Sequence, residues 1–207
     1  MQRSLQHRAR MGVLLFMVIG AMACAGKRDL YVYYQLPQPN AGMKGTIVGV
    51  EFEDKRPVKQ FLTKEALEEF YTFSGKFSFS VTQGEVTETT GILDLPRVMT
   101  LTMTKRLENE GMTVLPNPAP ENPVVRLVLQ DFQLHYVDRR WKVRLAYEAQ
   151  LLAGGEVRNR QVIKGSAERA QIIGTGDADK VVSELYNDMI NQLNVAKLFA
   201  NSGGDFQ

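Results

Sequence analysis

The chain has 207 residues, of which 44% are apolar, and this suits one compact domain. Three of the 25 Lys and Arg residues lie within residues 1–23, which hold no Asp or Glu, so the remainder carries 22 basic against 23 acidic residues. A nearly neutral domain lacks the global positive field that supports bulk nucleic-acid binding.

Residues 1–23 have the three regions of a secretory signal peptide. A basic segment (MQRSLQHRAR) precedes an apolar one (MGVLLFMVIGAMA), which ends in the small residues Ala21 and Ala23. The 13 apolar residues are too few to span a bilayer core, which needs about 20. We therefore expect residues 1–23 to be removed.

The single cysteine, Cys24, follows this segment directly. Ala21-Met22-Ala23-Cys24 resembles the lipobox of bacterial lipoproteins, in which a peptidase cuts before a cysteine that carries diacylglycerol and an N-acyl chain. The resemblance implies cleavage after Ala23 and stable anchoring through Cys24. In enteric lipoproteins Asp after the cysteine favours the inner membrane; Ala25 here implies the outer membrane, facing the periplasm. The alternative is a secreted protein with an incidental thiol, or an uncleaved membrane segment.

Residues 24–44 are predicted to be a lipid-anchored linker. A short edge strand is expected within it, followed by breaks at prolines: Leu30, Val32 and Tyr34, then Pro37 and Pro39. An extended chain from Cys24 to Gly45 would reach about 70 Å at most. With such a linker the domain need not lie against the bilayer.

The folded domain is predicted over residues 45–200, before a disordered tail at 201–207. A strand is expected at 47–52, a short helix after a Thr63 cap, and a strand or hairpin arm at 77–81. A second helix should run from the Asp94 cap to Gly111, and a brief strand should follow it.

Residues 125–165 predict a three-stranded antiparallel meander. Apolar residues change parity near Gln130 and Asp131, and a β-bulge there would return them to one face. With a turn at residues 138–139, six apolar pairs then fall into register: Tyr136–Trp141, Leu134–Val143, Phe132–Leu145, Leu129–Tyr147, Leu127–Ala149 and Val125–Leu151. A second turn at residues 154–155 would place Ile163 and Gly165 near Tyr147 and Leu145.

A closing helix is predicted from a cap at Thr175 or Asp177 through Phe199, with one apolar stripe that packs across the meander. The expected fold is therefore α+β: a two-layer sandwich of a mainly antiparallel sheet, containing the meander, with two main helices packed on one face.

Several segments resemble the YajG family of small bacterial lipoproteins over residues 30–199. They are YYQLPQP, Asp54-Lys55-Arg56, RLENEGMTV, VVRLVLQDFQLHY and the closing helix. Similar folds are found in the TolB amino-terminal domain, the auxiliary lipoproteins of lipid-transport ABC systems and lipoprotein activators of peptidoglycan synthases. The resemblance implies a non-enzymatic role in contacting other proteins.

Catalytic patterns are missing from the sequence. His135 is the only histidine after residue 23, its parity places it on the solvent side of a strand, and no G-x-S-x-G, H-E-x-x-H or Walker A pattern occurs. Asp177 and Asp179 make a phosphate site in IGTGDADK unfavourable and suit helix capping. We expect no catalytic residue, no metal and no cofactor.

Two groups of charges are candidate partner-binding residues. Asp54 and Arg56 follow the first central strand, although a structural ion pair or capped turn is the simpler explanation. Arg140, Lys142 and Arg144 point away from the apolar face of the meander and could bind lipid phosphate, anionic glycan or an acidic protein surface, although a solvated sheet face is the simpler explanation.

The leading hypothesis is a lipid-anchored periplasmic accessory subunit that docks onto a cell-envelope protein complex through a sheet edge or its basic strand face. The alternative is a lipid- or glycan-binding module of an envelope transport or peptidoglycan system, which would need an apolar groove beside the helices. A hydrolytic enzyme fits least. No nucleic-acid partner is expected, and the oligomeric state stays open.

Overall fold

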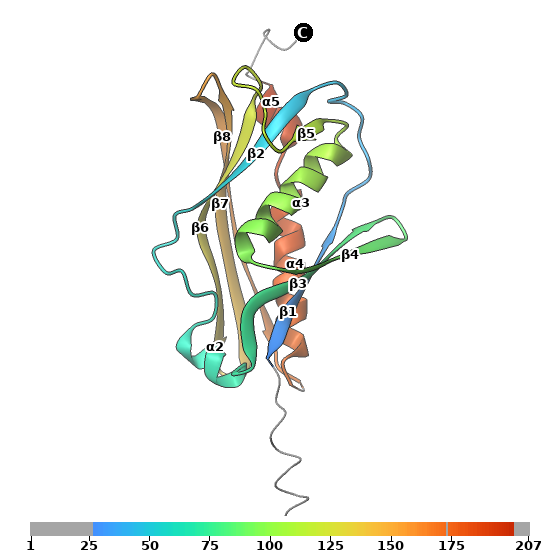
Figure 1. Ribbon diagram of the computed structural model, residues 1–207. Helices are drawn as coiled ribbons and strands as arrows, with labels where there is room; N and C mark the ends of the chain where they lie inside the picture. The colour runs from blue at the N-terminus through green and yellow to red at the C-terminus, as the bar shows by residue number, and fades with distance from the viewer. Residues whose placement is uncertain (1–26, 173, 201–207) are drawn as a thin grey trace, which may run out of the picture.

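The computed structural model describes residues 27–172 and 174–200, which form two β-sheets and four helices (Figure 1). The predicted signal peptide, Ala23, Cys24 and the tail at 201–207 lie outside these residues. The elements are β1 (Arg28–Gln35), β2 (Ile47–Asp54), α2 (Lys64–Glu69), β3 (Phe73–Gln83), β4 (Val86–Leu93), α3 (Leu95–Asn109), β5 (Thr113–Leu115), β6 (Val124–Val137), β7 (Arg140–Ala153), β8 (Glu156–Ala170), α4 (Gly176–Asn191) and α5 (Val195–Phe199).

The larger sheet has five strands in the order β5-β2-β6-β7-β8. All six predicted apolar pairs between β6 and β7 are present, and the register shifts between Leu129 and Asp131, so the predicted bulge is confirmed. Ile163 and Gly165 lie opposite Tyr147 and Leu145 as predicted. These pairs place the apolar side chains of β6 and β7 on one buried face of the sheet.

The smaller sheet has three strands in the order β1-β3-β4 and corrects the predicted architecture. Both sheets are mixed rather than mainly antiparallel, because β1 pairs parallel to β3 and β2 pairs parallel to β5 and β6. The partners β1 and β3 are separated by some 45 residues, and no local pattern reports such a pairing.

The predicted linker at 24–44 is also corrected over residues 28–35. These residues form β1, and Leu30, Val32 and Tyr34 are fully buried in the core. A strand that supplies three core side chains belongs to the domain, so the linker before it is short.

The helices begin where the sequence places their caps. The Asp94 carboxylate accepts from the Arg97 N–H (3.0 Å), and Gly111, after α3, has the positive φ of 91° expected for a helix stop. The closing helix is shorter than predicted. It ends at Asn191, and the side chain of Asn194 accepts from Lys197 N–H (2.8 Å) to begin α5.

Helices α3 and α4 cover the buried face of the larger sheet, α3 against β2 and β5 and α4 against β7 and β8. Helix α4 also lies along β1, so it joins the two sheets (Figure 1). Gly165 of β8 permits this close packing, because a Cβ there would lie 2.6 Å from Met189 Sδ. The opposite face of β6–β8 carries the charged side chains.

Candidate functional site

The uncovered side of the meander brings together polar side chains from three strands, and we call this set the outer strand face. The register places His135, Lys142 and Glu168 in one row across β6, β7 and β8, and Gln133, Arg144 and Ser166 in the next row. Their neighbours along each strand, such as Leu134 and Val143, point into the core. The outer strand face consists of Asp131, Gln133, His135, Arg140, Lys142, Arg144, Ser166 and Glu168.

A hollow of about 460 Å³ lies in the outer strand face. Its lining mixes hydrogen-bond donors with small and apolar groups: His135, Val137, Lys142, Val143, Arg144, Ser166, Ala167 and Glu168. The hollow is open to solvent over the side chains of Lys142 and Arg144, which are about half exposed.

Each predicted partner-binding cation of this face has a carboxylate neighbour. Arg140 Nη1 lies 2.9 Å from Glu168 Oε1, and Lys142 Nζ lies 3.6 Å from Glu168 Oε2. Arg144 Nε lies 3.2 Å from Asp131 Oδ2. Exposed pairs of this kind contribute about 0–1 kcal/mol each to stability, so an incoming acidic group can replace the internal carboxylate at low cost.

His135 lies at the rim of the hollow and is half-buried. Burial, and after it the nearby charge of Arg144, lowers the pKa of His135 below its ordinary value. Within residues 27–172 and 174–200 its Nε2 has no hydrogen-bond partner. The neutral ring therefore carries one buried nitrogen without a hydrogen-bond partner among the described residues.

Asp54 and Arg56, the other predicted pair, are committed to holding the end of β2. Arg56 is buried, donates to Asp54 through Nε (3.0 Å) and Nη2 (2.9 Å), and donates through Nη1 to the Phe132 carbonyl oxygen (3.2 Å). Hydrogen bonding from Arg56 lowers the pKa of Asp54 to about 2. This geometry links β2 to β6 beside the bulge and leaves the Arg56 guanidinium out of reach of a partner.

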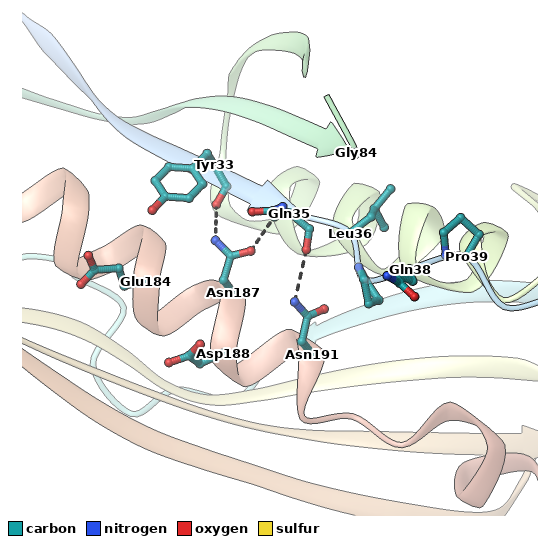
Figure 2. Close-up of a pocket in the computed structure, with 11 residues that line it drawn as sticks. Tyr33, Gln35, Leu36, Gln38, Pro39, Gly84, Glu184, Asn187, Asp188 and Asn191 are labelled. Atoms are coloured by element: carbon teal, nitrogen blue, oxygen red, sulfur yellow. Dashed lines mark hydrogen bonds between the residues drawn. The ribbon is translucent and has the colours of Figure 1, made fainter. Parts of the chain in front are cut away.

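A second hollow, of about 710 Å³, lies between the end of β1 and α4 (Figure 2). It is lined by polar and apolar residues: Tyr33, Gln35, Leu36, Pro37, Gln38, Pro39, Gly84, Glu184, Asn187, Asp188 and Asn191. The alternative function needs an apolar groove beside the helices. The carboxylates and amides of this hollow do not provide one.

The amides of this hollow are already bonded to β1. Asn187 accepts from the Gln35 N–H (2.7 Å) and donates to the Tyr33 carbonyl oxygen (3.0 Å), and Asn191 donates to the Gln35 carbonyl oxygen (3.2 Å), as Figure 2 shows. One turn earlier on α4, Ser183 accepts from the Tyr33 N–H (3.2 Å). Asp179 accepts from the Tyr31 N–H (3.0 Å).

These four α4 residues are spaced four apart, and their side chains make the hydrogen bonds to the backbone of β1 that a neighbouring strand would otherwise make. Four helical residues rise about 6.0 Å and two strand residues about 6.6 Å, so every turn of α4 meets the next outward-facing backbone unit of β1. Sequence reasoning missed this set. Its signal was present as polar residues at positions 179, 183, 187 and 191, beside the apolar stripe of the same helix.

In residues 27–172 and 174–200 no group of three or more His, Cys, Asp or Glu side chains could hold a metal ion. Ser166 and His135 both line the hollow, but β7 separates their strands. The exposed charges of the outer strand face suit it to contacts through charge and hydrogen bonds.

Comparison with known proteins finds a solved structure with a similar fold. No protein-family model matches the chain, and no curated protein matches its sequence. A solved DUF330 protein from Xanthomonas campestris superposes with a TM-score of 0.53 at 8% identity, over 84% of this chain and 96% of that one. The chain shares that protein's fold. This likeness shows the fold alone, and the resemblance to the YajG family stays a prediction.

Two further solved structures are more distant. Lipoprotein GNA1162 from Neisseria meningitidis has a TM-score of 0.35 at 11% identity, over 71% of this chain and 99% of that one. A putative neuraminyllactose-binding hemagglutinin homolog from Helicobacter pylori has a TM-score of 0.36 at 10% identity, over 79% and 94%. Superpositions this loose carry no functional argument.

None of the helices in the described part of the chain is both long enough and apolar enough to cross a membrane.

Proposed function

We propose that this chain is a lipid-anchored periplasmic protein of the bacterial envelope, held at the outer membrane through Cys24. Its domain acts without catalysis, as an accessory subunit that binds a protein partner. The leader and lipobox support the location, and the exposed strand face supports the mode of binding.

The observation that carries the binding proposal is the row of cations around the hollow. Arg140, Lys142 and Arg144 lie at alternate positions of β7, Lys142 and Arg144 line the hollow, and the three side chains are 41–52% exposed. A sheet holds such groups at fixed spacing, so a partner with matching carboxylates gains several charge-assisted hydrogen bonds at once. The partner surface we propose is therefore acidic.

Crosslinking in native membranes tests this surface. The triple variant Arg140→Glu, Lys142→Glu, Arg144→Glu should lose the crosslinked partner bands of the wild-type protein. A matched control reverses Arg158 and Arg160, which are as exposed but lie toward the other end of β8. Equal loss from both variants, or unchanged bands from the triple variant with an intact fold, would remove the outer strand face as the docking site.

Labelling with a radioactive fatty acid tests the anchor. The wild-type chain should incorporate label, and Cys24→Ser should incorporate none. Equal labelling of the two would refute lipidation at Cys24. Separation of inner and outer membranes by density then shows which of them carries the labelled protein.

A further inference from the structure

The domain holds the first residue of β1 rigidly, and this fixes where the anchor must attach. The Arg28 N–H donates to the Thr72 carbonyl oxygen (2.7 Å), and its guanidinium lies 5.2 Å from the centre of the Phe70 ring. The same guanidinium bonds to Thr175 and Asp179 at the start of α4. Arg28 is thus fastened to the segment that follows α2 and to the start of α4.

Only three residues separate Arg28 from Cys24. Four Cα-to-Cα steps span about 14 Å when fully extended. If Cys24 carries the lipid, as the proposed function requires, Arg28 lies within about 14 Å of the headgroup layer. The domain cannot stand away from the bilayer, as a linker of 21 residues would have allowed.

One end of the domain surrounds Arg28, and we call it the anchor-proximal end. It comprises α2, the β6–β7 turn, Gln171, Ile172 and the start of α4 (Figure 1). Hydrogen bonds tie these parts together: Gln171 Nε2 donates to Glu69 Oε1 (2.6 Å), and the Gln171 N–H donates to the Arg139 carbonyl oxygen (3.0 Å). Helix α5 lies at the opposite end (Figure 1).

The anchor-proximal end exposes large apolar side chains. Ile172 is 79% exposed, Tyr71 72% and Leu67 47%. Leu67 lies on α2, and Tyr71 lies in the turn that directly follows this helix. Tyrosine favours the boundary between headgroups and acyl chains, because its ring is apolar and its hydroxyl needs water or a polar partner.

The charges at this end are mixed. Exposed Lys and Arg residues are interspersed with exposed carboxylates: Lys27, Lys64, Lys76 and Arg139 with Glu65, Glu68 and Asp138. A mixture of this kind gives little attraction to anionic lipid. Contact with the bilayer would therefore rest on the short tether and the apolar side chains.

We propose that the anchor-proximal end lies on the bilayer surface, with Tyr71, Ile172 and Leu67 in the headgroup layer. The strands β6–β8 then extend away from the membrane, over about 46 Å for the 14 residues of β7. Arg140 and Lys142 begin β7 next to the β6–β7 turn, so the partner meets the outer strand face close to the membrane. This orientation rests on the anchor that the proposed function places at Cys24.

Site-directed fluorescence on the full-length lipidated protein tests the orientation. Lipidation consumes the thiol of Cys24, so an introduced cysteine is the only free thiol. Tyr71→Cys, Ile172→Cys and Leu67→Cys are labelled with a polarity-sensitive maleimide dye and reconstituted into phosphatidylethanolamine and phosphatidylglycerol vesicles. Val86→Cys (72% exposed) matches Tyr71→Cys, and Val157→Cys (48%) matches Leu67→Cys, both away from the anchor.

The three anchor-proximal labels should shift to shorter emission wavelength on reconstitution and lose most of their fluorescence to a headgroup-level nitroxide lipid. The two control labels should stay quenchable by aqueous iodide. Equal iodide quenching at all five positions, in protein that floats with the vesicles, would overturn the proposed orientation. Protection of the three anchor-proximal labels from iodide in native membranes but not in the vesicles would overturn it as well. Failure of the anchor itself reads out differently: the wild-type chain would then fail to float and would take up dye at Cys24.

Discussion

Two Arg–carboxylate pairs in this domain have the same closest distance, 2.9 Å, and opposite roles. The Arg56 side chain is 6% exposed, donates hydrogen bonds to Asp54 through two nitrogens, and donates through the third to the Phe132 carbonyl oxygen. Arg140 is 51% exposed and reaches Glu168, itself 50% exposed, through one nitrogen. The nitrogen-to-oxygen distance alone does not distinguish an ion pair that stabilises the fold from one whose arginine is free to bind another carboxylate.

Burial and further bonds separate them. A buried guanidinium that loses its partner is left desolvated and uncompensated, whereas an exposed one returns to water. Substitutions in the buried pair at the end of β2 should therefore change stability strongly. Substitutions in the exposed pair of the outer strand face should change stability little but binding strongly.

The largest effect is expected from Arg56→Met. This variant keeps the bulk of the side chain but removes the guanidinium that donates to Asp54 and to the Phe132 carbonyl oxygen, and leaves Asp54 with only the residue 56 N–H and Lys59 as donors. We therefore expect a loss of about 3 kcal/mol in the free energy of unfolding. Urea denaturation measures it. Arg140→Met, the control, should change that free energy by less than about 0.5 kcal/mol, and equal losses would contradict the comparison.

The next largest effect is expected at acid pH, where protonation of Asp54 weakens its ion pair with Arg56 and lowers the free energy of unfolding. The folded pKa of about 2 lies below the ordinary value of 3.8, so the ionised carboxylate stabilises the fold above about pH 4, and this contribution is lost as the pH falls through about 2. Asp54→Asn should be less stable than the wild type at neutral pH. The difference should narrow between about pH 4 and pH 2 in a denaturation series; a constant difference would place the effect elsewhere.

A smaller effect on stability is expected from Glu168→Gln, which releases Arg140 and Lys142. The free energy of unfolding should fall by less than about 1 kcal/mol. Crosslinking to an acidic partner should increase, because the internal competitor has been removed. Unchanged or weaker crosslinking would show that the partner does not compete with Glu168.

The smallest effect is expected from His135. Its lowered pKa means that the unfolded chain takes up a proton before the folded one, so its contribution to stability is full above about pH 6.5 and is lost as the pH falls below it. His135→Gln should flatten the dependence of the unfolding midpoint on pH in that range. A steeper slope in the variant would contradict this sign.

The sequence predicted the pairing of β6 with β7 and part of the pairing of β7 with β8, but not the register shift between Leu151 and Leu152, and it predicted the candidate site in part. The bulge at residues 129–131 and six apolar pairs follow from parity, because side chains alternate along a strand and only one phase shift brings both apolar sets to one face. The same parity places Arg140, Lys142 and Arg144 outward. It does not report Glu168 and Asp131 as their partners, since these lie on neighbouring strands.

The sequence also determines two helix starts, because the capping side chains of Thr63 and Asp94 act on backbone within a few residues. It did not predict the break at residues 192–194 that begins α5.

Only the tertiary structure decided the place of β1. Its alternating apolar residues fit an edge strand on a loose linker as well as a strand of the core. The choice depends on β3, some 45 residues later, and on the polar residues of α4, about 150 residues later. Contacts over such separations come from chain topology, which local periodicity does not encode. That choice reduces the stretch between Cys24 and the first core strand to three residues, and so brings the domain to the membrane.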